Sequence, residues 1–168
     1  MQNDVRRLAR LPWPWRIGLG IPLLAGLVIA IGAAISWLGA DYKRPEQIEA
    51  GRADDFAIGS RTYFKEEQVW LVRLPDGAFA ALYDRDPESS CAVSFRFDYE
   101  FMGRKGWFRD ACHGSVYDLA GRCFDGPCQR DLDGFTVDTS GGNVVVKLRE
   151  FVRGPPRDPS AEPLNPPQ

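Results

Sequence analysis

The sequence predicts a small, mostly antiparallel β-domain preceded by one transmembrane helix. Three observations lead to this expectation: an uncharged apolar stretch near the N-terminus, two hairpin signatures further along, and a length of 168 residues, which suits one domain plus an anchor. The patterns divide the chain into five segments: an N-terminal segment (1–16), a transmembrane helix (17–38), a linker (39–53), a β-domain (54–152) and a Pro-rich tail (153–168).

The apolar stretch is long enough to cross a bilayer. From Ile17 to Leu38 the chain runs 22 residues without a charged side chain, and ~20 apolar residues in a helix span a hydrocarbon core of ~30 Å. Aromatic residues sit where interface belts are expected, at Trp13, Trp15, Trp37 and Tyr42. A cleaved signal peptide is the competing interpretation, but its apolar region usually has only about 7–15 residues.

The charge distribution predicts the orientation. Residues 1–16 carry four Arg and one Asp, whereas residues 41–168 carry 17 Lys/Arg against 22 Asp/Glu. The positive-inside rule therefore favours a cytoplasmic N-terminus and an extracytoplasmic C-terminal domain at the cell membrane. The pair Arg6-Arg7 is only a weak match to a twin-arginine export signal. Because basic and acidic residues are interspersed, we expect no nucleic-acid partner.

The soluble part shows strand patterns. Residues 68–83 form two apolar runs around a Pro-Asp-Gly turn, and residues 134–148 form two more around Ser-Gly-Gly-Asn. Both stretches are typical of antiparallel hairpins. The linker is polar, and from Gly154 the chain has six Pro in 15 residues with little apolar bulk. We therefore expect a disordered tail.

A family resemblance rests on one loop and its surroundings. Residues 112–121 read Cys-His-Gly-Ser-Val-Tyr-Asp-Leu-Ala-Gly, which resembles the second cluster-binding loop of Rieske proteins. Gly126-Pro127 matches the loop that covers the cluster in that family, and residues 132–148 match its closing hairpin. The resemblance spans residues 54–150 and implies a small β-sandwich or barrel carrying a [2Fe–2S] cluster, as in the membrane-anchored iron–sulfur subunit of quinol:cytochrome c oxidoreductase.

The ligand positions depart from the family. Rieske clusters are held by Cys-x-His in one loop and Cys-x-x-His in the other. With His113 fixing the register, the resemblance places Asp110 and Asp86 where the ligand cysteines stand, and Glu88 where the other histidine stands. Only His113 remains of the four ligands. Since carboxylate is a hard oxygen ligand with poor affinity for such a centre, we expect no cofactor.

The four cysteines are interpreted from the same resemblance. Cys91 and Cys112 occupy the positions of the disulfide that ties the two loops in many Rieske proteins, and Cys123 and Cys128 could form a second bridge beside Gly126-Pro127. Four cysteines allow three pairings, so the assignment depends on the family. In that family the residues at Ser115 and Tyr117 hydrogen-bond to the cluster and to a cysteine sulfur.

Three other interpretations of the ligand positions stay open. One is a sulfur site rebuilt from all four cysteines, although extracytoplasmic thiols at these spacings usually oxidise. Another is a mononuclear Mn, Fe(II) or Zn site made of Asp86, Glu88, Asp110 and His113. The third, which we favour, is that Arg85 and Arg109 neutralise the adjacent aspartates at a solvated loop tip.

The sequence favours a role within a membrane complex. There is no nucleophile–base pair and no phosphate-binding loop, and the single His leaves no catalytic residues to assign. We expect a structural or regulatory subunit of a respiratory or photosynthetic electron-transfer complex, with the membrane and other subunits as partners. The alternative is an electron-transfer subunit of an oxidoreductase with an altered iron–sulfur or mononuclear metal site.

Overall fold

The chain forms two compact units, Met1–Lys43 and Arg44–Gln168, and the computed structural model describes residues 26–32 and 45–165. In the first unit, residues 26–32 are helical and exposed. The rest of the predicted transmembrane helix (17–25 and 33–38) and the segment 1–16 lie outside the described residues. Within the described ranges, no helix has the length and apolar content that crossing a bilayer requires.

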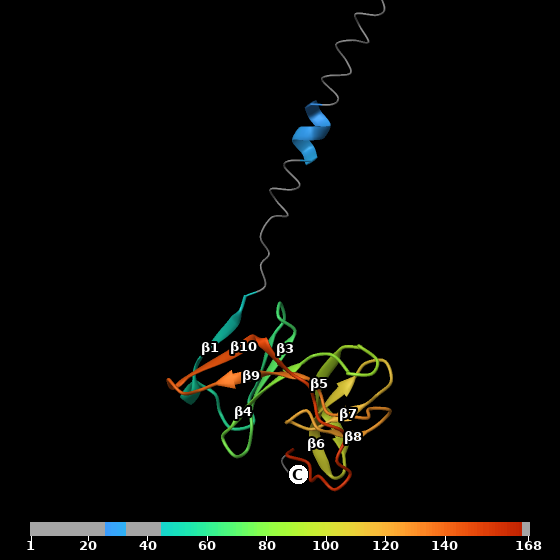
Figure 1. The fold of residues 1–168 in the computed structure, drawn as a ribbon. Coiled ribbons are helices and arrows are strands. Elements are labelled where there is room, and N and C mark those ends of the chain that lie inside the picture. The colour runs from blue at the N-terminus through green and yellow to red at the C-terminus, as the bar shows by residue number, and fades with distance from the viewer. Residues whose placement is uncertain (1–25, 33–44, 166–168) are drawn as a thin grey trace, which may run out of the picture. The chain divides into compact units, whose positions relative to one another are not determined.

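The second unit is built of two antiparallel sheets (Figure 1). The larger sheet has six strands in the order β1-β10-β9-β4-β3-β2. Its strands are β1 (Gln47–Arg52), β2 (Arg61–Phe64), β3 (Val69–Arg73), β4 (Phe79–Tyr83), β9 (Gly134–Asp138) and β10 (Asn143–Val152). A 3₁₀ turn, η1 (Ala53–Asp55), follows β1.

The smaller sheet has four strands in the order β5-β6-β7-β8. They are β5 (Val93–Phe101), β6 (Arg104–Asp110), β7 (Val116–Tyr117) and β8 (Cys123–Asp125). Every strand pair in both sheets is antiparallel. The predicted fold class, mostly antiparallel β, is therefore confirmed.

The first predicted hairpin is β3–β4, and it lies at the centre of the domain. Val69 pairs with Tyr83 and Arg73 with Phe79 across the hairpin. Because successive side chains of a strand point to opposite faces, Leu71 packs on one side of the large sheet and Val72 on the other, each in a different hydrophobic cluster. Burial on both faces explains why this stretch is apolar at nearly every position.

The two hydrophobic clusters hold the sheets together. One joins the large sheet to the small one and includes the side chains of Val72, Leu82, Val93, Phe95, Phe108, Tyr117, Leu119, Cys123, Cys128 and Leu132. The other covers the opposite face of the large sheet, around Ile48, Val69, Leu71, Ala81, Val144 and Val146. Since β5 to β8 are attached through the first cluster, the loops of the small sheet are held on a packed base.

The predicted second hairpin is β9–β10, and it extends further than expected. It runs to Val152, with a register irregularity between Lys147 and Phe151. Its outer edge pairs with β1 from Gln47↔Lys147 to Arg52↔Asn143. The structure thus differs from the predicted linker 39–53: residues 47–52 form an edge strand because β10 offers unpaired backbone groups and Ile48 is buried. Residues 39–44 lie outside the described residues.

The prediction of a disordered tail is wrong for the part that the structure describes. The N–H of Gly154 donates to Asp133 Oδ1 at 2.9 Å, and the N–H of Asp131 donates to the carbonyl of Pro155 at 2.9 Å. Asn165 is only 1% exposed. Backbone and amide hydrogen bonds hold this segment in place of apolar burial, and its prolines lose little conformational entropy on ordering. Residues 166–168 lie outside the described residues.

Candidate functional site

The site consists of two loops at one end of the small sheet. The first loop (residues 84–92) joins β4 to β5, and the second loop (residues 110–115) includes the end of β6 and leads into β7. A disulfide joins Cys91 to Cys112, with their Cα atoms 6.1 Å apart. The N–H of Ala111 also donates to the carbonyl of Ala92 at 3.0 Å. The predicted tie between the loops is therefore present.

Asp86 anchors the first loop from inside. Asp86 is only 2% exposed. Its Oδ1 accepts hydrogen bonds from the N–H groups of Glu88 at 3.0 Å and Ser89 at 2.7 Å. Its Oδ2 accepts a bond of 2.6 Å from the hydroxyl of Tyr117. The carboxylate thus has three donors and organises the turn that follows it.

Asp110 plays the same part in the second loop. It is 3% exposed, and its carboxylate accepts from the N–H groups of Cys112 at 3.0 Å and His113 at 2.8 Å. The N–H of Asp110 itself donates to the carbonyl of Ser115 at 3.0 Å and closes the loop. Both residues that the resemblance places at ligand-cysteine positions therefore accept hydrogen bonds from the second and third N–H groups after them.

The electrostatics of the pair Asp86–Tyr117 follow from burial and these contacts. Burial raises the pKa of Asp86, but the hydrogen bonds from Tyr117 and Ser89 outweigh it and leave the pKa below its ordinary value. The pKa of Tyr117 is raised by burial and by its bond to Asp86. Asp86 is therefore a carboxylate and Tyr117 a neutral donor at neutral pH.

The neighbouring arginines do not neutralise these aspartates. Arg85 Nε lies 3.5 Å from Asp84 Oδ1, and the Arg109 guanidinium lies 4.3 Å from the centre of the Tyr99 ring. The prediction that Arg85 and Arg109 compensate Asp86 and Asp110 at a solvated tip is thus wrong, because both carboxylates are buried and are satisfied by loop N–H groups.

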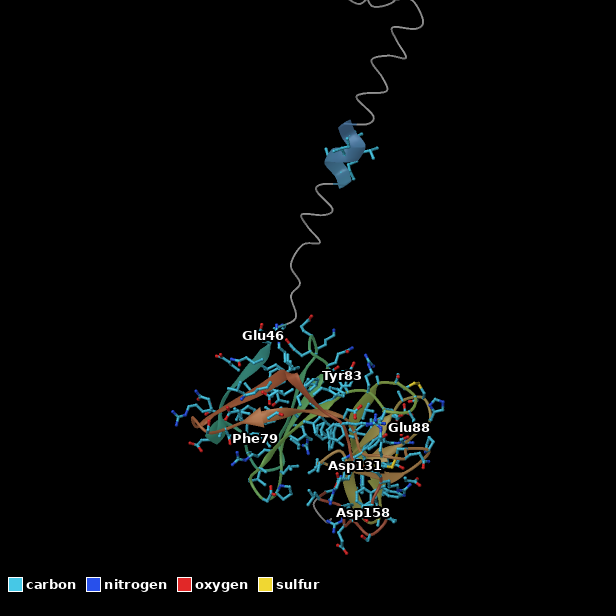
Figure 2. The ribbon with its side chains drawn as sticks, in the orientation of Figure 1. Glu46, Phe79, Tyr83, Glu88, Asp131 and Asp158 are labelled. Carbon is cyan, nitrogen blue, oxygen red and sulfur yellow. A yellow bond between two sulfur atoms is a disulfide. The ribbon has the colours of Figure 1, made fainter. Side chains whose placement is uncertain are left out.

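The predicted mononuclear set is not brought together. Among the described residues, the side chains that could jointly hold a metal are Cys91, Asp110, Cys112 and His113, with one ligand atom of each within 4.8 Å of the others. Asp86 faces Tyr117 instead, and Glu88 is exposed. Figure 2 places Glu88 on the side of the domain away from Phe79 and Glu46.

The loop of Gly126-Pro127 packs on the second loop. A Cβ at Gly126 would lie 2.7 Å from Ser115 Cα, and its φ of +87° suits glycine. The disulfide between Cys123 and Cys128 closes this loop at its base, with Cα atoms 6.2 Å apart. The hydroxyl of Ser115 is buried and makes no hydrogen bond of ordinary geometry within the described residues. The Gly126-Pro127 loop therefore lies against the backbone of the second loop.

These donors do not fit a [2Fe–2S] cluster of the Rieske type. Such a cluster needs two thiolates on one iron and two imidazoles on the other. The positions that the resemblance assigns offer the two carboxylates of Asp86 and Asp110, the exposed Glu88 and one imidazole, that of His113. Carboxylate is a hard oxygen ligand with poor affinity for this centre. Cys91 and Cys112 are joined to each other and provide no thiolate in this state.

The two loops, the disulfide that joins them and the Gly126-Pro127 loop that packs on the second one are the features on which the resemblance to Rieske proteins rests. The chain is 25% identical to the cyanobacterial plasma membrane Rieske protein PetC3 from Synechocystis PCC 6803. This match covers 60% of this chain and 98% of that one, at a TM-score of 0.44. It is 18% identical to a chain in the complex of reduced oxygenase and oxidized ferredoxin in carbazole 1,9a-dioxygenase, covering 64% and 98% at a TM-score of 0.43.

A third similar structure is the putative NADH-dependent nitrite reductase small subunit from Mycobacterium tuberculosis. It is 22% identical, and the match covers 60% of this chain and 92% of that one at a TM-score of 0.37. No family model matches the sequence, and no curated protein matches it.

Sequence reasoning missed the clamp around Asp118. Its buried carboxylate accepts from the Arg122 side chain at 2.6 Å and from the N–H of Leu164 at 3.1 Å. It also accepts from the N–H groups of Ala120 and Arg122, each at 2.9 Å. The Tyr-Asp-x-x-Gly pattern contained the signal for a capped turn, but nothing in it indicated that the C-terminal segment would return to this point.

Proposed function

We propose that this chain is a membrane-anchored, Rieske-like protein without a working cluster, serving as a structural or regulatory subunit of a respiratory or photosynthetic electron-transfer complex. The main support for the proposal is the way in which the carboxylates of Asp86 and Asp110 are bonded. Each stands where the resemblance puts a ligand cysteine, and each is buried and bonded to N–H groups of its own loop. The carboxylates preserve the shape of the loops without supplying sulfur to iron.

The anchor and its orientation belong to the same proposal. The uncharged stretch from Ile17 to Leu38 and the arginines before it support a single span with the β-domain outside the cytoplasm. The two disulfides support that compartment, since such bonds form and persist in oxidising surroundings. An intact scaffold at the end of a tether is suited to docking against other subunits.

The iron content of the full-length protein tests the proposal. The chain is purified from membranes in detergent and assayed for iron, acid-labile sulfide and a Rieske-type paramagnetic signal after reduction, beside a genuine Rieske protein prepared identically. We expect a colourless protein with none of the three, because two thiolates and one imidazole are missing from the assigned positions. Near-stoichiometric iron and sulfide would refute the proposal and favour an electron carrier with an altered site.

The partner half of the proposal needs a separate experiment. Native membranes are treated with a short amine-reactive cross-linker and solubilised in mild detergent, and proteins attached to this chain are identified. Subunits of an electron-transfer complex are the expected partners. A chain that is recovered intact but unlinked from membranes in which known complexes do cross-link would contradict a role as a subunit.

A further inference from the structure

Four metal-binding side chains meet where the two loops are tied. One ligand atom from each of Cys91, Asp110, Cys112 and His113 lies within 4.8 Å of the others. In the oxidised protein the two sulfurs are bonded to each other, so of the four side chains only those of Asp110 and His113 have a ligand atom outside a disulfide. We propose that reduction of the Cys91–Cys112 disulfide converts this group into a tetrahedral site for Zn²⁺. This inference does not depend on the proposed function.

The donor set suits zinc once the sulfurs are separate. Two thiolates, one imidazole and one carboxylate are typical Zn²⁺ ligands, at about 2.3 Å for sulfur and about 2.0–2.2 Å for nitrogen and oxygen. Around one ion, tetrahedral ligand atoms lie roughly 3–4 Å apart. After reduction the two sulfurs must move apart to this separation. The group already lies within 4.8 Å, so shifts of about 1 Å in each of the ligand atoms would complete the geometry.

The disulfide that must open is the accessible one of the two. Cys112 is exposed and Cys91 half-buried, whereas Cys123 and Cys128 are 3% and 1% exposed. Thiol–disulfide exchange requires that the attacking thiolate reach a sulfur. A dithiol reductant should therefore open Cys91–Cys112 first and leave the second bridge closed.

The exchange balances as a two-electron step. The dithiol transfers two electrons and two protons to Cys91 and Cys112 and is itself oxidised to a disulfide. When Zn²⁺ binds, both thiols lose their protons to solvent, because the thiolate is the ligand. The metal itself undergoes no redox change.

The surroundings support these ligands in three ways. Asp110 is held by the N–H groups of Cys112 and His113, and such hydrogen bonds orient a ligating carboxylate. His113 Nδ1 lies 3.6 Å from Asp110 Oδ2, and the imidazole is 58% exposed and able to turn. With Zn²⁺ bound to three anionic ligands the site would carry one negative charge, and Arg96 and Arg109 line the same surface hollow of about 420 Å³.

Zinc would take over the role of the disulfide in the reduced protein. The bond between Cys91 and Cys112 ties the first loop to the second, and an ion held by both sulfurs makes the same connection. Because Zn²⁺ binds only the reduced form at these sulfurs, it draws the thiol–disulfide equilibrium toward that form.

Metal binding by the full-length protein in detergent tests the inference. The protein is reduced with limiting dithiol, and alkylation with peptide mapping verifies free thiols at Cys91 and Cys112 only. Zn²⁺ is then titrated against a chromogenic chelator. We expect one tightly held ion per chain in the reduced protein and at least about 100-fold weaker binding in the oxidised one. Co²⁺ in place of Zn²⁺ should give the intense visible bands of a tetrahedral site with thiolate ligands.

Variants separate this site from other thiols. His113→Ala, at an exposed loop position, should weaken Zn²⁺ binding at least about 10-fold, and Asp110→Asn should do likewise. Alkylation of Cys91 and Cys112 in the wild-type protein should abolish binding without any mutation. Cys123→Ala/Cys128→Ala is the matched control and should bind as the wild type does. Equal binding in the reduced and oxidised proteins, binding that survives alkylation, or an octahedral Co²⁺ spectrum would each overturn the inference.

Discussion

Tyr117 donates a hydrogen bond of 2.6 Å to Asp86 across 31 residues of sequence. The bond joins strand β7 of the small sheet to the first loop, and both partners are buried, at 0% and 2% exposure. A buried carboxylate is stable only when donors surround it. The position at which the resemblance places a ligand cysteine thus holds a carboxylate with the Tyr117 hydroxyl as its partner.

Replacing Tyr117 with Phe should destabilise the domain. Asp86 would keep its two N–H donors but lose the hydroxyl, and a hydrogen bond to a charged group contributes about 1.5–3 kcal/mol. We expect the free energy of unfolding in urea at neutral pH to fall by about 2 kcal/mol.

Tyr63→Phe is the matched control for this experiment. Tyr63 also donates to an aspartate, Asp84, at 2.5 Å, but its residue is 39% exposed. Asp84 is itself buried, but Arg85 Nε stays 3.5 Å from its Oδ1 and water can enter beside the exposed ring. The cost should therefore be smaller than at Tyr117, about 1 kcal/mol. If the free energy of unfolding falls equally in the two variants, the hydrogen bond between Tyr117 and Asp86 contributes no more than the one between Tyr63 and Asp84.

The stability of the domain should depend on the ionisation of Asp86. Its pKa in the folded protein lies below the ordinary value of 3.8. A lowered carboxyl pKa adds stability above the unfolded pKa, and this contribution disappears as the pH falls through the folded pKa. Urea unfolding of the wild type and of Asp86→Asn should therefore differ most above about pH 5 and converge as the pH falls toward 2. A constant difference across that range would rule out the ionised form as its source.

Asp131 and Asp133 make opposite contributions to the pH dependence of the free energy of unfolding. The pKa of Asp131 is raised, chiefly by burial, so its ionisation opposes folding. The pKa of Asp133 is lowered, because the bonds from Arg130 and Gly154 outweigh its burial. Only the difference between the wild type and a single variant therefore isolates one carboxylate.

The two disulfides should differ in their effect on stability. On the chain-entropy model the bridge with a sequence separation of 21, Cys91–Cys112, contributes about 3 kcal/mol, and the bridge with a separation of 5, Cys123–Cys128, contributes about 2 kcal/mol. We expect Cys91→Ser/Cys112→Ser to lower the urea midpoint through loop entropy alone. Cys123→Ala/Cys128→Ala leaves small cavities in the core as well, since both residues are buried.

The two disulfides should also be reduced in a fixed order, Cys91–Cys112 before Cys123–Cys128. Mild reductant should release two thiols and lower stability in one step in the wild type, and should have no such effect on Cys91→Ser/Cys112→Ser. If that variant releases two thiols at the same reductant concentration, the accessibility argument for Cys91–Cys112 fails.

Much of the domain could be predicted from the sequence because its signals are local. The hairpin over residues 68–83 is specified by two apolar runs and a turn in which the Asp76 side chain accepts from the N–H of Ala78 at 2.9 Å and Gly77 adopts a φ of +86°. The pairing of Cys91 with Cys112 required the family motif, since spacing alone leaves three pairings open.

The parts that were missed depend on distant contacts. Strand β1 has few apolar residues, and it is ordered because the edge of β10 pairs with it. Asn165 is buried by contacts with residues 46 and 59 positions earlier. The roles of Asp86 and Asp110 were misjudged because an Arg precedes each one, whereas the chain turns each carboxylate inward to its own loop. Local charge could not reveal that direction.

The proposed membrane topology is based on the arginines before Ile17. We expect protease added to spheroplasts to remove the β-domain and spare an epitope placed at Met1, because the positive-inside rule retains the N-terminus in the cytoplasm. Protease added to inverted vesicles should give the opposite pattern. Arg6→Gln/Arg7→Gln should preserve the orientation only in part, and a β-domain protected in intact spheroplasts would exclude the predicted topology.

The C-terminal segment is predicted to act as part of the core through Asn165. Its side-chain oxygen accepts from the N–H of Leu119 at 3.3 Å, and its amide donates to the carbonyl of Gly106. In Asn165→Ala both backbone groups would lose their partner in a buried site, at a cost of about 1–3 kcal/mol each. We therefore expect the free energy of unfolding to fall by at least about 2 kcal/mol and trypsin to cleave earlier at Arg157.

Glu162→Gln is the control, because its side chain is exposed and, within the described residues, only its carbonyl is bonded, to Arg122. It should leave both measurements unchanged. If Asn165→Ala behaves like Glu162→Gln, the segment beyond Arg153 is not held by this residue, and the packing described for Asn165 does not govern stability in solution.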